Sequence, residues 1–329
     1  MNEKSLKVLE QYEIEVISTR RGRGSYICET NQGKKLLANC GSSEKKMAFV
    51  NRVLETMRGR GYLYADTVLA NREGNLLTPD YEDEACIVKD WYEGRECDTK
   101  SMTDIEHAVK RLAQLHKLMH LLPEEDSSDG NYVGEDLKSE LERHNRELRK
   151  VYSFVRKRKQ KNEFEILFLN CFRMFYEQAQ EALKLLEQSD YDTLRGEVLQ
   201  NGALCHGNFN QHNVWFVSKN QVFVGNFEKC RYDVQPSDLY HFLRKIMEKQ
   251  EWPKQNGYRM IECYDKERTL DRREWNYLYI RLLYPEKFWK LTNQYYNHNK
   301  AWVPMKSTEK MQTLIHQQDQ RNSFLKTLE

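Results

Sequence analysis

The first ninety residues switch between short apolar runs and turn residues, which is typical of a small sheet. Strand-like runs cover residues 13–19, 25–30, 34–40, 64–69, 76–81 and 85–91. A Ser cap after the third run is followed by apolar residues at helical spacing, and Gly59 marks the end. The pattern therefore predicts a small antiparallel sheet that carries one main helix.

From Ser101 onward the apolar residues recur at helical spacing. Ser101 and Asp104 have the spacing of a capping box at the start of a helix. Helical patterns continue over 135–187 and from Pro236 to the end, with a hairpin-like pair at 213–227 between them. We predict an α+β chain with two parts. Residues 1–91 form a β-rich part with one main helix, and residues 92–329 form a larger, mostly helical part with a hairpin at 204–228.

Composition excludes several classes of protein. Of the 329 residues, 31% are charged, and no apolar run reaches the roughly 18 residues that cross a membrane. The net charge of +2 gives no reason to expect nucleic acid as a partner. The eight cysteines are scattered singly, which indicates reduced, packed thiols rather than disulfides or a zinc site. The first residues include acids where a signal peptide would be basic, so we expect a cytoplasmic protein.

The most specific chemistry lies between residues 204 and 228. His206 begins the triplet His-Gly-Asn, Asn213 follows five residues after the triplet's Asn208, and the triplet Asn-Phe-Glu ends at Glu228. Phosphoryl transfer uses an acid to orient the acceptor hydroxyl, then an Asn and a second acid to hold Mg²⁺. The order and spacing fit that template, but Asn208 and Asn226 stand at the positions of the two acids.

With these motifs the chain resembles the aminoglycoside phosphotransferase and choline kinase group, whose loop reads His-Gly-Asp-x-x-x-x-Asn followed by Asp-Phe-Asp/Glu. It resembles most closely the spore-coat CotS family of kinase-like proteins. The matching blocks are CHGNFNQHNVWF, NFEKCRYDVQPSDLYHFLRKIMEKQEW and RLLYPEKFWKLTNQYYNHNKAW. The resemblance covers essentially the whole chain. It implies a two-lobed protein-kinase-like fold, ATP and Mg²⁺ as ligands, a small-molecule substrate, and assembly into the spore coat with other coat proteins.

The resemblance also implies a set of site residues. Asn208 takes the position of the catalytic Asp, with His206 beside it in the loop. Asn213, Asn226 and Glu228 form a degenerate Mg²⁺ site. Ala38 takes the position of the phosphate-binding Lys, and Lys34 or Lys35 could serve if the register shifts. Gly22 and Gly24 occupy the phosphate-loop position.

These departures favour a protein that is catalytically impaired. Asn is nearly isosteric with Asp, but it carries no charge and cannot act as a base near neutral pH. Losing general-base assistance costs roughly 10²–10⁴ in rate, and Mg²⁺ relies on anionic oxygens. We expect a pseudokinase that acts in binding or assembly. One alternative is an active small-molecule phosphotransferase with a displaced metal site that uses Glu228 and Asp238, with Glu228 and Asn213 as the pair that could hold a metal. The other is a nucleotide-binding module without turnover.

Three further features each have more than one interpretation. Asp238 could brace the loop, or it could cap a helix together with Ser237. The segment 143–161, with nine basic residues and one acid, could be a solvated helix face or could dock an acidic partner. An aromatic set could form helical core, a protein-binding surface or the lining of a substrate cleft: Trp275, Tyr277, Tyr279, Tyr284, Phe288, Trp289, Tyr295, Tyr296 and Trp302.

Overall fold

The computed structural model describes residues 3–22, 24–124, 132–218, 221–297 and 305–329. The chain forms two compact units. The first consists of Met1–Val133 and Val198–Asp238, and the second of Gly134–Glu197 and Leu239–Glu329. The predicted lobe boundary at residue 91 falls inside the first unit and stays a prediction.

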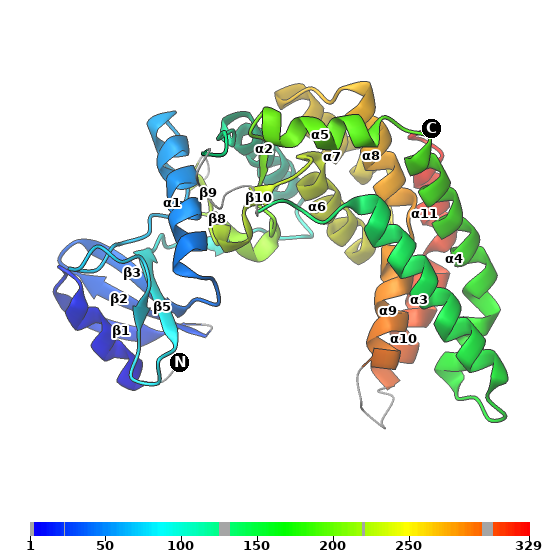
Figure 1. Cartoon of the computed structure of the whole chain (residues 1–329), viewed down its shortest axis with the longest axis horizontal. Coiled ribbons are helices and arrows are strands. Elements are labelled where there is room, and N and C mark those ends of the chain that lie inside the picture. Colours follow the sequence, from blue (N-terminus) through cyan, green and yellow to red (C-terminus); the bar gives the residue numbers. More distant parts are fainter. Residues whose placement is uncertain (1–2, 23, 125–131, 219–220, 298–304) are drawn as a thin grey trace. The chain divides into compact units, whose positions relative to one another are not determined.

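An antiparallel sheet forms the N-terminal part of the first unit (Figure 1). Its strands, in spatial order, are β1 (Val16–Arg21), β2 (Ser25–Thr30), β3 (Gly33–Asn39), β5 (Ala85–Asp90) and β4 (Thr78–Pro79). A 3-10 helix, η1 (Glu3–Gln11), packs its apolar residues against one face, which carries Tyr26, Cys28, Leu37, Cys86 and Val88. Strands are confirmed at 16–21, 25–30, 33–39 and 85–90, whereas the run at 76–81 yields only the two residues of β4.

The strand predicted at 64–69 does not form a continuous ladder, but its backbone is extended along the sheet as predicted. Residues in it form isolated bridges, and its backbone runs beside β5. The amide of Leu69 donates to the carbonyl of Val88 at 2.8 Å, and the amide of Asp90 donates to the carbonyl of Thr67 at 2.9 Å. This course brings Asp66, which lies in the run, next to β5.

Two helices of the first unit begin at serine caps. The side chain of Ser43 accepts from the amide of Lys46 before α1 (Glu44–Gly59), as the sequence predicted. Ser101 caps α2 (Met102–Leu118) by accepting from the amide of Asp104 at 3.3 Å. The predicted capping box is only half formed, because the Asp104 carboxylate binds the guanidinium of Arg95 instead of the Ser101 amide.

The segment after residue 200 forms the predicted hairpin. β8 (Val214–Phe216) pairs with β9 (Val222–Val224), and β6 (Arg95–Glu96) pairs with the other edge of β8. A second ladder joins β7 (Leu204–Cys205) to β10 (Arg231–Tyr232). Short 3-10 turns, η3 (Gln211–Asn213) and η4 (Phe227–Lys229), flank the hairpin. The amide of Gly225 donates to the carbonyl of Asn213 at 3.1 Å, so the two sequence motifs are adjacent.

The remaining chain is helical, as predicted. The helices are α3 (Leu137–Lys157), α4 (Glu163–Glu187), α5 (Tyr191–Gln200), α6 (Pro236–Lys249), α7 (Lys254–Glu267), α8 (Arg272–Leu283), α9 (Glu286–Asn297), α10 (Met305–His316) and α11 (Gln318–Leu325). Helices α3 and α4 lie side by side (Figure 1). None of the described helices combines the length and the apolar character needed to cross a membrane.

Aromatic side chains form much of the core of the second unit. Phe164, Phe168, Phe175 and Phe288 are buried there, and Trp289, Tyr295 and Tyr296 pack against them partly buried. The core interpretation is confirmed for six members of the predicted aromatic set, which are buried or pack against the core: Tyr277, Tyr284, Phe288, Trp289, Tyr295 and Tyr296. Trp275 and Tyr279 are half-buried, and their role stays a prediction. Trp302 lies outside the described residues.

Candidate functional site

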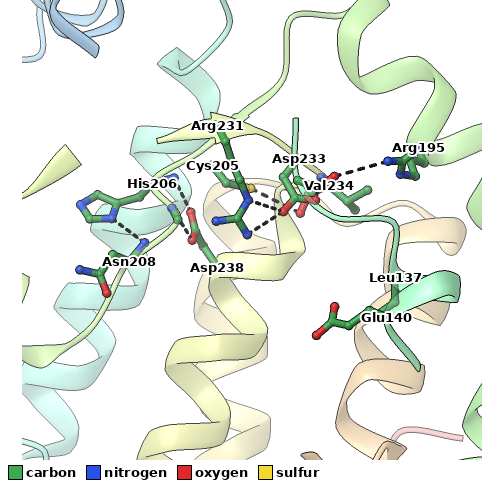
Figure 2. A network of polar contacts seen from close by, with 12 residues as sticks. Leu137, Glu140, Arg195, Cys205, His206, Asn208, Arg231, Asp233, Val234 and Asp238 are labelled. Atoms are coloured by element: carbon green, nitrogen blue, oxygen red, sulfur yellow. Dashed lines mark hydrogen bonds and ion pairs between the residues drawn. The ribbon is translucent and has the colours of Figure 1, made fainter. Parts of the chain in front are cut away.

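Asp238 holds the loop that begins at His206 (Figure 2). Its carboxylate accepts from the amides of His206 at 2.6 Å and Gly207 at 3.0 Å, and its Oδ2 lies 3.2 Å from Nε2 of His116. Burial raises the pKa of Asp238, but hydrogen bonding and charge from His116 outweigh burial and lower that pKa to about 2. The prediction that Asp238 braces the loop is confirmed, and the helix-cap interpretation is wrong because Asp238 lies inside α6.

His206 is a second brace of the loop. The amide of Asn208 donates to its Nδ1 at 3.1 Å, so Nε2 carries the proton and donates to the carbonyl of Gly225 at 3.0 Å. The ring is fully buried, and burial lowers its pKa. A neutral imidazole with both nitrogens engaged is suited to fixing the loop and leaves no free nitrogen for proton transfer.

Gly207 lets the loop approach η4 closely. Its φ of +75° lies in the left-handed region, which glycine adopts without strain. A Cβ at this position would overlap the carbonyl oxygen of Lys229 and approach the guanidinium of Arg231. Arg231 itself is held by Asp233, whose Oδ2 accepts from Nε at 3.0 Å and Nη2 at 2.8 Å (Figure 2).

A chain of amide hydrogen bonds connects the loop to the second motif. The carbonyl of Asn208 accepts from Nδ2 of Asn213 at 2.8 Å, and Oδ1 of Asn213 accepts from Nδ2 of Asn226 at 2.7 Å. Oδ1 of Asn226 accepts from the ammonium of Lys89 at 2.7 Å. A carbonyl can only accept and an ammonium can only donate, so the two ends fix the orientation of both side-chain amides.

Lys89 is the centre of the polar site. Besides Asn226, its ammonium contacts the carboxylates of Asp66 at 3.2 Å and Glu228 at 3.1 Å. The Asp66 carboxylate also accepts from the amide of Asn226, which has a φ of 67°. Burial lowers the pKa of Lys89, but the two carboxylates outweigh burial and raise that pKa. Burial raises the pKa of Glu228, and Lys89 outweighs this effect so that the net direction is downward.

Strand alternation explains why Lys89 reaches this site. Lys89 pairs with Leu36 across the β3–β5 ladder, and Ala38 pairs with Ile87. Side chains two positions apart in a strand share a face, so Lys89 projects from the face that carries Ala38. Lys35 has the opposite parity, and its ammonium lies 2.5 Å from its cross-strand neighbour Asp90. The shifted-register alternative, in which Lys35 would serve the site, does not fit this register.

The glycines at the phosphate-loop position form the turn between β1 and β2. The amide of Gly22 donates to the carbonyl of Ser25 at 2.8 Å, and Gly24 has a φ of +71°. Arg23, between them, lies outside the described residues. The two glycines therefore shape a tight turn, and their proposed role in holding phosphate stays a prediction.

Sequence reasoning missed Lys89 and Asp66. The signal was present, because each is a charged residue inside a strand-like apolar run, and such a charge needs a partner when it is buried. Lys89 is 3% exposed and Asp66 is 5% exposed. What the sequence could not supply was the pairing between residues 65–69, β5 and η4, which brings the charges together.

The donor set in this site does not match what Mg²⁺ prefers. Asn226 turns its oxygen to an ammonium and its nitrogen to Asn213, and the nearby carboxylates of Glu228 and Asp66 are paired with Lys89. Magnesium binds through anionic and water oxygens in a strict octahedron. His116, Cys205 and Asp238 also lie close together, but both oxygens of Asp238 and the thiol of Cys205 already have hydrogen-bond partners.

Comparison with known proteins shows the family. Residues 5–328 match the family model described as "Spore coat putative kinase YutH". The chain belongs to this family of kinase-like spore coat proteins. It is similar to Spore coat protein S of Bacillus subtilis (strain 168), with 23% identity in an alignment 326 positions long that covers 94% of this chain and 88% of that protein.

Solved structures show the same fold. An aminoglycoside phosphotransferase from Alicyclobacillus acidocaldarius is similar with a TM-score of 0.87 and 18% identity, over 98% of this chain and 94% of that one. The AMP-bound spectinomycin phosphotransferase APH(9)-Ia is similar with a TM-score of 0.68 and 12% identity, over 97% of each chain. The predicted α+β, two-lobed kinase-like fold is confirmed.

Proposed function

We propose that the protein is a catalytically impaired pseudokinase that acts in binding or assembly in the spore coat. The observation that carries the proposal is the ammonium of Lys89, bound to Oδ1 of Asn226 and Oε1 of Glu228 at 2.7 and 3.1 Å. These are oxygens that a metal at this site would use. A divalent ion about 4 Å from the ammonium would be repelled by roughly 8 kcal/mol at an effective dielectric constant of about 20, so metal binding requires the ammonium to leave.

The amide chain supports the same conclusion. With an Asp at position 226, a carboxylate oxygen would face Oδ1 of Asn213, which is an acceptor. Asn213 has no freedom to turn, because its nitrogen already donates to the carbonyl of Asn208. In a site without metal, Asn226 therefore makes hydrogen bonds that an Asp could not make. Each buried group left unsatisfied by the Asp would cost about 1–3 kcal/mol.

The loop also lacks a base for the acceptor hydroxyl. Asn208 stands at that position, and its Oδ1 accepts from Nδ2 of Asn210 at 3.2 Å. A carboxamide does not take up a proton near neutral pH, so the general-base contribution of roughly 10²–10⁴ in rate is lost. The neighbouring His206 does not replace it, because its two nitrogens hold the loop.

Calorimetric titration with AMP-PNP, with and without Mg²⁺, tests the proposal. We expect the wild-type protein to show no Mg²⁺-dependent binding. We expect the double variant Lys89→Met/Asn226→Asp to gain it, because the cation is removed and a carboxylate is restored. Lys35→Met/Asn226→Asp is the matched control and should gain nothing, since Lys35 projects from the other face of the sheet. Tight Mg²⁺-dependent binding by the wild type, or ATP consumption that Glu228→Gln abolishes, would overturn the proposal.

A nucleotide-binding module without turnover is the second candidate, and Lys89 favours it. Its ammonium is a fixed positive charge on the face of the sheet where the phosphate-binding Lys of the family is expected. Among solved structures of similar fold, spectinomycin phosphotransferase APH(9)-Ia holds AMP, and the amicoumacin kinase hAmiN holds AMP-PNP with Ca²⁺. Binding of AMP-PNP that is equal with and without Mg²⁺ and lost in Lys89→Met would favour this candidate over a role without ligand.

The assembly role is testable separately from nucleotide binding. Family membership suggests association with the spore coat and with other coat proteins. In a spore-forming host, we expect a fluorescent fusion carrying Asn208→Ala to reach the coat as the wild-type fusion does. Loss of coat localisation in Asn208→Ala, with normal protein level, would contradict a role that needs no catalysis.

A further inference from the structure

Three potential metal ligands meet in the second unit, within the part of the chain that the structure describes. Glu140 and His144 are four residues apart on α3, so they lie on one face of the helix. Glu286 is the first residue of α9. One ligand atom from each of the three lies within 4.8 Å of the other two. Modest rotations of the side chains would bring these atoms onto a single ion.

His144 has a buried nitrogen without a partner. The side chain is 1% exposed, and no hydrogen-bond partner for its Nδ1 exists among the described residues. Its ring stacks on Trp289 with centroids 3.3 Å apart, which fixes the orientation of the ring. Burial lowers the pKa of His144 to about 4, so the imidazole is neutral and has a lone pair to donate at physiological pH. An unsatisfied buried nitrogen costs about 1–3 kcal/mol, and an ion bound at Nδ1 would remove that cost.

The two glutamates each keep an oxygen available. Nη1 of Arg281 donates to Oε2 of Glu140 at 3.3 Å, and Nζ of Lys290 lies 2.8 Å from Oε1 of Glu286. A carboxylate has two oxygens, and metal-bound carboxylates usually accept hydrogen bonds on the other one. Burial raises the pKa of Glu286, but Lys290 and Arg281 outweigh it and lower that pKa to about 2, so this carboxylate is ionised.

We propose that Glu140, His144 and Glu286 bind one divalent transition-metal ion of the Zn²⁺ class, with the fourth position open to water. An imidazole with two carboxylates is a nitrogen–oxygen set that suits Zn²⁺. Mg²⁺ and Ca²⁺ prefer oxygen ligands alone. Arg281 and Lys290 offset part of the negative charge, which further disfavours ions held by charge only. The bound ion links α3 to α9 and stabilises the helical unit, independently of the polar site around Lys89.

The test uses the full chain without a polyhistidine tag, stripped of metal with a chelator and carrying Cys263→Ser. Cys263 is the one partly exposed cysteine, and the other seven are buried. Zn²⁺ is titrated by calorimetry, and Co²⁺ is titrated while its visible absorption is recorded. We expect one ion per chain, a Zn²⁺-dependent rise in melting temperature, and a cobalt spectrum without a thiolate charge-transfer band.

Variants assign the ligands. Glu286→Gln and His144→Gln should each weaken binding at least tenfold, since each removes one of three ligands. Glu142→Gln is the matched control on α3, because Glu142 is paired with Arg146 on the helix surface and should not affect binding. If the metal-free melting curve shows that Glu286→Gln or His144→Gln does not fold, Glu140→Gln is used in its place as the ligand variant. Absence of saturable binding, wild-type affinity in the ligand variants, or a thiolate band in the cobalt spectrum would overturn the proposal.

Discussion

Replacing Lys89 by Met removes the cation that joins β5 to the second motif. The Lys89 side chain is 4% exposed, and its partners Asp66 and Glu228 are 6% and 27% exposed. Breaking a buried ion pair by removing one partner costs about 3–5 kcal/mol, because a charge remains buried without compensation. Glu228 can turn toward water, whereas Asp66 cannot. We therefore expect Lys89→Met to lower the free energy of unfolding by about 3 kcal/mol, near the lower end of that range.

The assay is urea unfolding followed by tryptophan fluorescence and by circular dichroism, because coincident transitions are needed before a single free energy is assigned. The double variant Lys89→Met/Asp66→Asn should recover most of the loss. An Asn at position 66 keeps an oxygen for the amide of Asn226 and leaves no buried charge. A loss below about 1 kcal/mol in the single variant would refute the reasoning, since it would place Lys89 in the range of surface ion pairs. A double variant no more stable than the single one would refute it equally.

Three further results are expected. Gly207→Ala should lower the melting temperature, because its Cβ has no room and its φ is +75°, whereas Gly196→Ala, with open space around it, should not. At pH 7 the wild type should be more stable than Asp238→Asn by about 2–3 kcal/mol, because folding lowers the pKa of the Asp238 carboxyl to about 2. This advantage should disappear as the pH falls from about 4 to 2. Metal-free protein should lose stability as the pH falls from about 6.5 to 4, because the pKa of His144 is about 4 in the folded state and near 6.5 in the unfolded state. In His144→Gln the melting temperature should change less over this pH range, which thermal melts at a series of pH values would show.

The sequence predicted the elements whose burial pattern is local. Helix α1 follows from apolar residues at helical spacing after Ser43, and the β8–β9 hairpin follows from two apolar runs around a turn. The capping box at Ser101 was only half correct, because Arg95 competes for the Asp104 carboxylate. That competition depends on the pairing of β6 with β8, which no local pattern encodes.

The sequence was enough to predict the loop that begins at His206, but it was not enough to predict that Lys89 supplies the cation of the site. The spacing of Asn208, Asn213 and Asn226 indicated which positions converge, because a loop, a strand and a turn fix their order in space. Lys89 could not be assigned in the same way. Its role depends on which face of β5 it occupies, and that face is set by register against β3. A one-residue shift would exchange Lys89 for its neighbour Asp90.

The loop separates the groups that hold its shape from the groups that would act on a ligand. Asp238 and His206 have the charge and tautomer that bracing requires, and both are buried and fully hydrogen-bonded. Asn208 and Asn226 carry amides at the positions where phosphoryl transfer would need carboxylates. The Asn226 amide is bonded to Asn213 and to the ammonium of Lys89, and the Asn208 amide oxygen accepts from Nδ2 of Asn210. If the site had merely decayed, unpaired polar groups should remain around the position where the family template places a metal. Instead, each amide has a partner of the correct polarity, and a side-chain cation contacts the oxygens that a metal would use. This arrangement favours a loop kept for its rigid shape, which is what a protein that binds without turnover requires.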